Sequence, residues 1–244
     1  MEIIYTKTGS KGNCTIVKNG SILFMIDCGI PLDEVNKAIG YKLTDVNCCL
    51  ITHAHSDHSK YISKVLERGI TCYMSKETQE TLKLSSCMID NIENFKNQHV
   101  MVVDGKGFSH ICFKPFDLPH SNADGTPCKN FGYLIKSKLD GEQLMLATDC
   151  HYNNYVFPPC EYYMVECNYE QIDDYKPIIE NINFHVEKRR FKSHMSLEKC
   201  KDFLSKQDLS KCKTIYLIHI SDKTHDGERF KKEIEKLTGK EVIV

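Results

Sequence analysis

The sequence predicts one layered α/β domain that spans residues 1–244. Short apolar runs typical of buried strands alternate with amphipathic stretches typical of helices along the whole chain, and layered α/β domains have this alternation. No internal repeat, low-complexity tract or long linker interrupts the pattern. A hydrophobic fraction of 41% is sufficient for one sizeable core.

Strands and turns dominate the first third of the chain. The expected strands cover residues 3–5, 14–18, 21–26, 48–51 and 70–74, and the expected helices cover residues 31–39, 61–66 and 75–84. Asn19-Gly20 predicts a hairpin turn between the second and third strands. The glycine-rich segment Gly9-Ser10-Lys11-Gly12-Asn13 lacks the full P-loop pattern and leads into a strand, so it does not predict a nucleotide site.

The alternation continues through the rest of the chain after the irregular segment 85–98. Strands are expected within residues 99–116, in a hairpin formed by 131–136 and 143–148, and at 162–165 and 214–218. Helices are expected at residues 170–181, 196–206 and 226–237. Polar residues follow several of these strands directly, and these residues are the candidates for chemistry.

The densest chemical feature is the segment His53-Ala54-His55-Ser56-Asp57-His58, which follows a buried strand and precedes a helix. His53 and His55 are two residues apart, so they lie on the same side of an extended segment. Asp57 and His58 should point elsewhere, because the chain enters a helix there. Such a density is rarely coincidental in a chain with 11 histidines. The segment can supply ligands to two metal ions.

Three further candidate ligands, His120, Asp149 and His219, also stand at the ends of expected strands. If these strands belong to one sheet system, their ends share an edge, which is where open α/β folds place their sites. Histidine together with aspartate favours Zn²⁺, Mn²⁺ or Fe²⁺ over Ca²⁺ and Mg²⁺. A carboxylate that bridges two such ions holds them about 3.5–4 Å apart. Asp27, at the end of the third strand, is either a loop residue or a partner of a metal-bound histidine.

The H-x-H-x-D-H pattern of residues 53–58 resembles the signature of the metallo-β-lactamase superfamily. The resemblance implies a four-layer αββα sandwich, in which two mixed β-sheets pack face to face, helices cover the outer faces and the metal site lies at one sheet edge. Within the superfamily the chain resembles the YycJ/WalJ-type branch, which is regarded as a set of DNA exonucleases, and its closing motifs are similar to ribonuclease Z. The finer resemblance is carried by Gly9–Thr15, Ile26–Gly29, Ala147–Asp149, Val165–Asn168, Arg189–Ser196 and Ile218–Ser221.

The resemblance also implies two divalent metal ions, Zn or Mn, and a role for each matching residue. The first metal would be bound by His53, His55 and His120, the second by Asp57, His58 and His219, and both by Asp149. His194 matches a histidine that assists the leaving group, and Glu166 matches a carboxylate that orients it. The residues favour the same distinction, because His219 ends a buried strand whereas His194 precedes a helix. The segment from Ser121 to Asn130 looks longer than the family's usual His-Asp-Ala turn.

The overall composition excludes some broad classes. The formal charge of -1, from 32 basic and 33 acidic residues, gives no global attraction to nucleic acid or membranes. No apolar run is long enough for a membrane span, and the first residues do not resemble a secretory signal. The 13 cysteines contain no Cys-x-x-Cys pair, which argues against a zinc knuckle or a thioredoxin-type site. Many cysteines lie within apolar runs, so we expect free thiols and a cytoplasmic location.

The candidate residues predict a metal-dependent hydrolase that acts on a phosphodiester, either nucleic acid or a small molecule. Asp57 would orient or deprotonate the attacking water, and His194 would protonate the leaving oxygen. A basic run just before His194, formed by Lys188, Arg189, Arg190 and Lys192, is either a phosphate-binding patch or an ordinary solvated run.

Two other classes stay open: a hydrolase of carboxylic substrates, of the lactonase or thioesterase type, and a non-catalytic protein that binds metal or nucleic acid. The remaining histidines are expected to be ordinary surface or core residues; they are His99, His110, His151, His185 and His225. The oligomeric state is not predicted.

Overall fold

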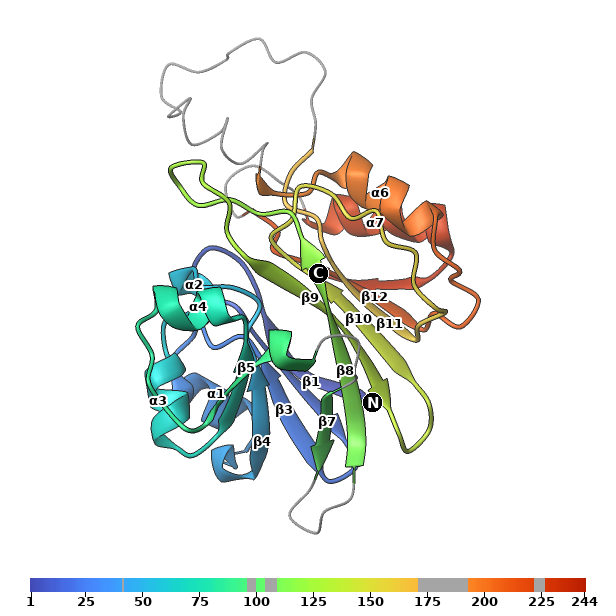
Figure 1. Cartoon of the computed structure of the whole chain (residues 1–244). Coiled ribbons are helices and arrows are strands. Elements are labelled where there is room, and N and C mark those ends of the chain that lie inside the picture. Colours follow the sequence, from blue (N-terminus) through green and yellow to red (C-terminus); the bar gives the residue numbers. More distant parts are fainter. Residues whose placement is uncertain (41, 96–99, 104–108, 171–192, 222–226) are drawn as a thin grey trace. The chain divides into compact units, whose positions relative to one another are not determined.

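The computed structural model describes residues 1–40, 42–95, 100–103, 109–170, 193–221 and 227–244. The strands are β1 (Glu2–Lys7), β2 (Cys14–Asn19), β3 (Ile22–Ile26), β4 (Val46–Leu50), β5 (Thr71–Met74), β6 (Ile89–Asn91), β7 (Val100–Val103), β8 (Ser109–Leu118), β9 (Asn130–Ser137), β10 (Gln143–Ala147), β11 (Tyr162–Glu166), β12 (Thr214–Ile218) and β13 (Glu241–Ile243). They form a six-stranded sheet in the order β1 to β6 and a seven-stranded sheet in the order β13 to β7 (Figure 1). Both sheets contain parallel and antiparallel pairs.

The helices are short. They are α1 (Leu32–Ala38), α2 (Ser56–Ser59), α3 (Ile62–Glu67), α4 (Lys76–Thr81), α6 (Leu197–Ser205) and α7 (Gly227–Thr238), with 3₁₀ turns at Leu43–Asp45 and Ile92–Phe95. Among the described residues no helix is long and apolar enough to cross a membrane, since a span needs about 20 apolar residues. The strand β13 has no counterpart among the expected elements, and most of the helix expected at 170–181 lies outside the described residues.

The chain divides into two compact units. Unit 1 contains Met1–Asp117 and Lys129–Met145, and unit 2 contains Leu118–Cys128 and Leu146–Val244. Whether the chain acts as a single domain over residues 1–244 stays a prediction.

In unit 1 the strands β3 to β6 run parallel, so their carboxyl ends share one edge of the first sheet. Ile26 and Leu50, the last residues of β3 and β4, are register partners. The residues that follow these strands, Asp27 and Ile51 to His53, therefore emerge side by side. This register is the physical reason that the His53–His58 segment meets Asp27.

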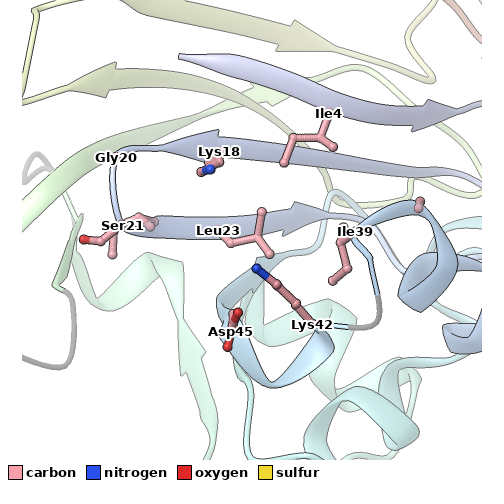
Figure 2. A pocket seen from close by; sticks show the side chains of 10 residues that line it. Ile4, Lys18, Gly20, Ser21, Leu23, Ile39, Lys42 and Asp45 are labelled. Carbon is pink, nitrogen blue, oxygen red and sulfur yellow. The ribbon is translucent and has the colours of Figure 1, made fainter.

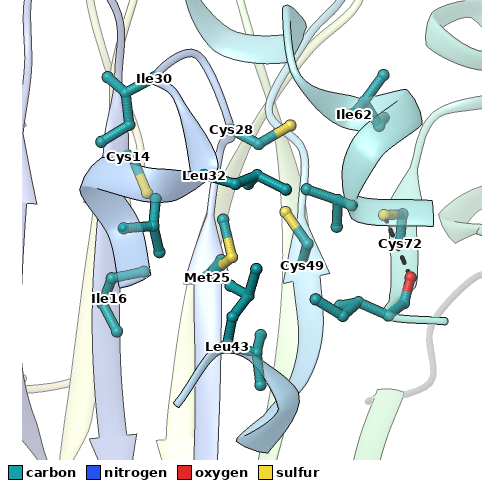
Figure 3. Packing of buried hydrophobic residues seen from close by; sticks show 14 of the residues in the cluster. Cys14, Ile16, Met25, Cys28, Ile30, Leu32, Leu43, Cys49, Ile62 and Cys72 are labelled. Carbon is teal, nitrogen blue, oxygen red and sulfur yellow. Dashed lines mark hydrogen bonds between the residues drawn. The ribbon is translucent and has the colours of Figure 1, made fainter. Parts of the chain in front are cut away.

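Apolar packing on both faces holds the first sheet in place. On one face the side chains of Met25, Cys49 and Cys72 lie across neighbouring strands, beneath residues of α1 and α3 such as Leu32 and Ile62 (Figure 3). Fully burying an apolar side chain of this size contributes about 1.5–3 kcal/mol.

The other face of the first sheet meets strands of the second sheet within unit 1. There the rings of Tyr73, Phe113 and Tyr133 make edge-to-face contacts at centroid distances of 5.1 and 5.9 Å. These rings join β5 to β8 and β9. A sheet buried on both faces explains the continuous apolar runs from which the strands were predicted.

Unit 2 places a parallel trio of strands against two helices. β11 pairs with β12 and β12 with β13, and Glu166 and Ile218 are register partners at the carboxyl ends of the first two. The side chain of Ser196 caps α6 by accepting a hydrogen bond from the backbone of Lys199 at 3.3 Å. Phe203 of α6 and Phe230 of α7 are fully buried. This packing fixes where β11 and β12 end, and hence where Glu166 and His219 lie.

All 13 cysteines are free thiols and 12 of them are buried; Cys87 is exposed. Burial raises the pKa of several of these thiols, Cys14, Cys48 and Cys150 among them. The thiols thus serve as small apolar core residues, as the sequence predicted.

Candidate metal centre

Unit 1 fixes the end of β4 before the histidines begin. The amide of Ile51 donates to the carbonyl of Tyr73 at 2.8 Å, and the hydroxyl of Tyr133 donates to the carbonyl of Ile51 at 2.6 Å. The carbonyl of Thr52 accepts a hydrogen bond from the amide of Phe131 at 3.0 Å. His53 and His58 are both completely buried. Their rings therefore extend from a rigid strand end rather than from a solvated loop.

Asp27 orients His58. Its Oδ2 lies 2.7 Å from His58 Nδ1, and its Oδ1 accepts from the backbone amide of Thr52 at 2.8 Å. The Thr52 hydroxyl also donates to the carboxylate, at 2.9 Å. Because Nδ1–H donates to a carboxylate, Nε2 of His58 keeps its lone pair, which is how metal-binding histidines are held. Of the two roles open for Asp27, the structure supports the partner of a ligand histidine.

The three imidazoles of the segment converge. Nε2 of His53 and Nδ1 of His55 are 3.0 Å apart, as their spacing predicted. The expectation that His58 points away from His53 is wrong, because their ring centroids lie 4.1 Å apart. The short helix α2 follows His55 at once and turns His58 back toward the strand end. Nε2 of His58 also lies 3.4 Å from Oδ2 of Asp57, so the carboxylate belongs to the same cluster.

Asn13 and Gly29 hold the Asp57 turn, a role that sequence analysis did not assign to them. The amide of Asn13 donates to the carbonyl of Asp57 at 2.7 Å, and the Asn13 side chain lies 3.2 Å from Asp57 Oδ2 and 2.9 Å from His58 Nε2. A Cβ on Gly29 would lie 1.7 Å from the Asp57 carbonyl oxygen, so only glycine fits there. The signals in the sequence were the Gly9–Asn13 turn and the Asp27-Cys28-Gly29 run.

Unit 2 brings together a second cluster, formed by Asp149, Glu166, His194 and His219. One ligand atom from each lies within 4.8 Å of the others. Oδ1 of Asp149 is 3.4 Å from both His219 Nε2 and His194 Nδ1. The two imidazoles stack, with centroids 5.0 Å apart and planes 12° from parallel. Asp149 and His219 offer a carboxylate and an imidazole, donors that suit Zn²⁺ or Mn²⁺, so these two residues fit a divalent metal.

Glu166 holds His194 more closely than it holds His219. Its Oε1 lies 2.6 Å from His194 Nδ1 and 3.5 Å from His219 Nδ1. Its Oε2 accepts from the amide of Cys150 at 2.8 Å, and the side chain is completely buried. The Nδ1 of His219 faces the amide nitrogen of Asn168 at 3.0 Å. Nε2 is therefore the His219 nitrogen that faces Asp149.

His120 lies beside His194 in unit 2, with their ring centroids 6.1 Å apart. It is nearly buried, with 8% of its surface exposed. The loop after it is longer than a tight turn, as expected. It closes on itself through an isolated bridge between Ser121 and Pro127 and a hydrogen bond from the amide of Cys128 to the carbonyl of His120.

Strained backbone marks three of the residues in these clusters. Asp27, Asp149 and His219 have φ angles of 61°, 52° and 57°, in the left-handed region that residues other than glycine seldom adopt. Each comes immediately or almost immediately after a buried strand. Such conformations cost about 1–3 kcal/mol each and persist where the surroundings impose them, most often at functional sites. The left-handed backbone at these three positions could not be predicted from the sequence.

The predicted site residues thus fall into two groups. Unit 1 brings together His53, His55, Asp57 and His58, and unit 2 brings together His120, Asp149, Glu166, His194 and His219. The basic run 188–192 and the histidines at 99, 185 and 225 lie outside the described residues.

A hollow of about 360 Å³ in unit 1 is not part of these clusters (Figure 2). Ile22 and Leu23 line it from the amino end of β3, and Lys18, Lys42 and Asp45 lie around it. The His53–His58 segment follows the carboxyl ends of the parallel strands, at the opposite edge of the sheet.

Comparison with known proteins agrees with this architecture. Residues 24–220 match the family model Lactamase_B_2, described as a β-lactamase superfamily domain. A comparison with curated proteins finds no match.

Solved structures resemble the chain over nearly its whole length. The metallo-β-lactamase fold protein YhfI from Bacillus subtilis superposes with a TM-score of 0.69 at 14% identity, covering 98% of this chain and 92% of that one. Zn²⁺-bound PqqB from Methylobacterium extorquens gives 0.63 at 12%, covering 94% and 84%, and the short form of human tRNase Z gives 0.58 at 15%, covering 99% and 94%. The predicted fold class, the metallo-β-lactamase fold with two mixed sheets and helices, is confirmed.

Proposed function

This chain belongs to the β-lactamase superfamily as a metallo-hydrolase, and we propose that it is a phosphodiesterase or nuclease that works with two divalent metal ions. The observation that carries the proposal is the buried pair of Glu166 and His194, with 2.6 Å between Oε1 and Nδ1. Hydrolysis of a phosphodiester must release an alkoxide, and a histidine held in one orientation by a carboxylate can protonate it.

The metals would be held by the histidines and carboxylates of both clusters. His53, His55 and His120 would take the first ion, Asp57, His58 and His219 the second, and Asp149 both. Such ions supply a nucleophilic water at neutral pH and neutralise charge on the phosphoryl oxygens. Zn²⁺ and Mn²⁺ match the donor set best.

The chain's own residues would divide the proton transfers between them. Asp57, whose Oδ2 is near His58 and Asn13, would orient the attacking water and accept its proton. His194 would donate from Nε2, because Glu166 occupies its Nδ1. Asp27 and Asn13 would keep His58 in the tautomer that binds metal.

A DNA strand cut from its end, as in the YycJ/WalJ-type branch, is the substrate that the sequence resemblance favours. RNA and small phosphodiesters share the same chemistry. A thioester would not need the Glu166–His194 pair, because a thiolate leaves without protonation. A lactone releases an alkoxide, as a phosphodiester does, so the two classes are separated by assay.

The test measures hydrolysis of bis-p-nitrophenyl phosphate and of end-labelled single- and double-stranded DNA by protein loaded with Zn²⁺ or Mn²⁺. We expect turnover of both kinds of substrate that is lost in His55→Ala. In His194→Ala, which retains its metal, DNA cleavage should fall about 10²-fold or more, because the sugar alkoxide must be protonated as it leaves. Bis-p-nitrophenyl phosphate should lose less, because p-nitrophenolate leaves without a proton. Hydrolysis of a lactone or thioester in place of phosphodiesters would refute the proposal. DNA cleavage by His194→Ala within about threefold of wild type would refute the role of that residue, and fewer than two ions per chain would refute the dinuclear centre.

A further inference from the structure

A loop of unit 2 lies along one face of α6 and displays aromatic side chains. The chain between β10 and β11 runs beside α6 (Figure 1) and contacts two residues of this helix and Gln207, which lies two residues beyond its end. His151 meets Lys199, the ring of Phe157 lies 6.3 Å from that of Phe203, and the Gln207 side chain donates to the carbonyl of Tyr155 at 3.0 Å. Lys199 and Phe203 are four residues apart, so they share one face of α6.

The loop presents its tyrosines from a fixed backbone. Tyr152 and Tyr155 are 45% and 44% exposed. The amide of Tyr155 donates to Asn153 Oδ1, and the amide of Phe157 donates to Gln207 Oε1, both at 3.0 Å. Single exposed apolar residues are ordinary on protein surfaces. The ring of Tyr152 lies 6.0 Å from that of His151, which contacts Lys199. Exposed rings on an anchored loop lose little conformational freedom when they bind a ligand.

This surface, which we call the aromatic strip, consists of His151, Tyr152, Tyr155 and Lys199. The Lys199 ammonium lies 2.6 Å from His151 Nε2, and within the described part of the chain it forms no ion pair with a carboxylate. The acidic residues of α6 precede positions 199 and 203 by one residue, about 100° around the helix. One of them, Asp202, is paired with Lys206. The strip itself therefore contains one cation, Lys199, and no carboxylate.

The strip begins next to the candidate catalytic residues. His151 follows Asp149 by two residues, and α6 begins three residues after His194. From Lys199 to Ser205, where α6 ends, the helical rise of about 1.5 Å per residue gives roughly 9 Å, room for a few nucleotides of one strand. A polymer bound along the strip would have one end near the Asp149 and His194 cluster of the same unit.

We propose that the aromatic strip binds single-stranded nucleic acid, with Tyr152 and Tyr155 stacked on bases and Lys199 in contact with a backbone phosphate. Every base has a π-face, so stacking on tyrosine holds a strand whatever its sequence. Bases inside a duplex are not available to these rings. The cation and the imidazole favour a polyanion over an apolar protein surface. The proposal rests on the proposed phosphodiesterase function and narrows its substrate to a single strand.

The test is fluorescence anisotropy with metal-loaded protein and a fluorescein-labelled phosphorothioate oligothymidylate of about 12 nucleotides, which resists cleavage. Tyr152→Ala and Tyr155→Ala should each weaken binding at least about fivefold, and Tyr152→Phe and Tyr155→Phe should bind within about twofold of wild type. Lys199→Ala should reduce the slope of log affinity against log salt by about 1. Lys211→Ala, an exposed lysine elsewhere in unit 2, is the matched control and should leave affinity unchanged. Oligouridylate in place of oligothymidylate distinguishes RNA from DNA.

The two proposals fail separately. If the protein hydrolyses bis-p-nitrophenyl phosphate but its binding of the oligonucleotide does not depend on the two tyrosines, the role of the aromatic strip is wrong and the phosphodiesterase proposal stands. If binding depends on the tyrosines but no phosphodiester is hydrolysed, the phosphodiesterase proposal is wrong. The role of the aromatic strip would also be wrong if the Phe and Ala variants lost the same binding affinity, or if a duplex bound as tightly as the single strand. Binding of a protein segment to the strip in preference to the oligonucleotides would contradict it as well.

Discussion

Asp27→Asn tests the effect of a hydrogen-bond partner on His58, one of the proposed metal ligands. Oδ1 of Asp27 accepts both from the amide of Thr52 at 2.8 Å and from its hydroxyl at 3.0 Å, while Oδ2 faces His58 Nδ1 at 2.7 Å. An asparagine whose carbonyl oxygen replaces Oδ1 keeps these two bonds to Thr52. It loses the second contact of the Thr52 hydroxyl, with Oδ2 at 2.9 Å, and reverses the bond to His58. Asparagine also tolerates the left-handed backbone at this position, where φ is 61°.

The reversed bond changes the tautomer of His58. The asparagine amide would donate to Nδ1, so the ring proton would move to Nε2, the nitrogen that faces Asp57 at 3.4 Å. A protonated Nε2 cannot bind metal. Loss of such an orienting partner costs 10–100-fold in metal affinity, about 1.4–2.7 kcal/mol. The lost charge-assisted bond should lower the free energy of unfolding of the metal-free protein by about 1–2 kcal/mol.

Asp27→Ala separates the two effects. It leaves the amide and hydroxyl of Thr52 and the His58 ring without their acceptor, at about 1–3 kcal/mol for each buried group. We therefore expect a loss of about 3 kcal/mol or more in Asp27→Ala, well beyond that of Asp27→Asn.

The assay is competitive zinc titration with a chromophoric chelator, beside urea unfolding of the metal-free protein. Asp33→Asn, an exposed carboxylate of α1, is the matched control and should change neither quantity. Two zinc ions bound by Asp27→Asn with wild-type affinity would show that Asp27 does not set the tautomer of His58, and the reasoning would then be wrong.

Three other changes give equally definite expectations. Glu166→Gln should lower kcat for DNA cleavage, which releases an alkoxide, about 10²–10⁴-fold with the metal content unchanged. The double variant with His194→Ala should be no slower than His194→Ala alone, because the two residues act as one unit; additive losses would show independent roles. Gly29→Ala places a Cβ 1.7 Å from the Asp57 carbonyl oxygen and should lower the free energy of unfolding in urea by about 3 kcal/mol or more. The control Gly69→Ala, where φ is 73° and the space around the residue is open, should cost about 1 kcal/mol. Equal losses in the two variants would mean that the Asp57 turn moves freely. Ellman's reagent should label one thiol, Cys87, in the native protein and all 13 after denaturation. The other thiols are shielded from the reagent, and burial raises the pKa of several of them. Rapid labelling of several thiols in the native protein would contradict the packing of the core.

The sequence by itself determined the features that depend on local pattern. Alternation of apolar runs located the strands, because buried strands need continuous apolar side chains whatever their partners. The spacing of His53 and His55 predicted that their rings converge, since side chains two residues apart share a side of an extended chain. His120, Asp149 and His219 were found because each stands at the end of such a run, whereas the roles of Glu166 and His194 came from the family resemblance.

Tertiary structure decided which groups orient these ligands. Asp27 meets His58 across 31 residues, and Asn13 meets it across 45. The register of the sheet and the close approach of Gly29 to the Asp57 turn bring these partners together. Neither can be read from a short stretch of sequence. The same holds for the ring of His58 beside His53 and for His151 beside Lys199, 48 residues away. Hydrogen-bond direction selects the nitrogen that a histidine offers to a metal, and that direction exists only after distant strands have paired.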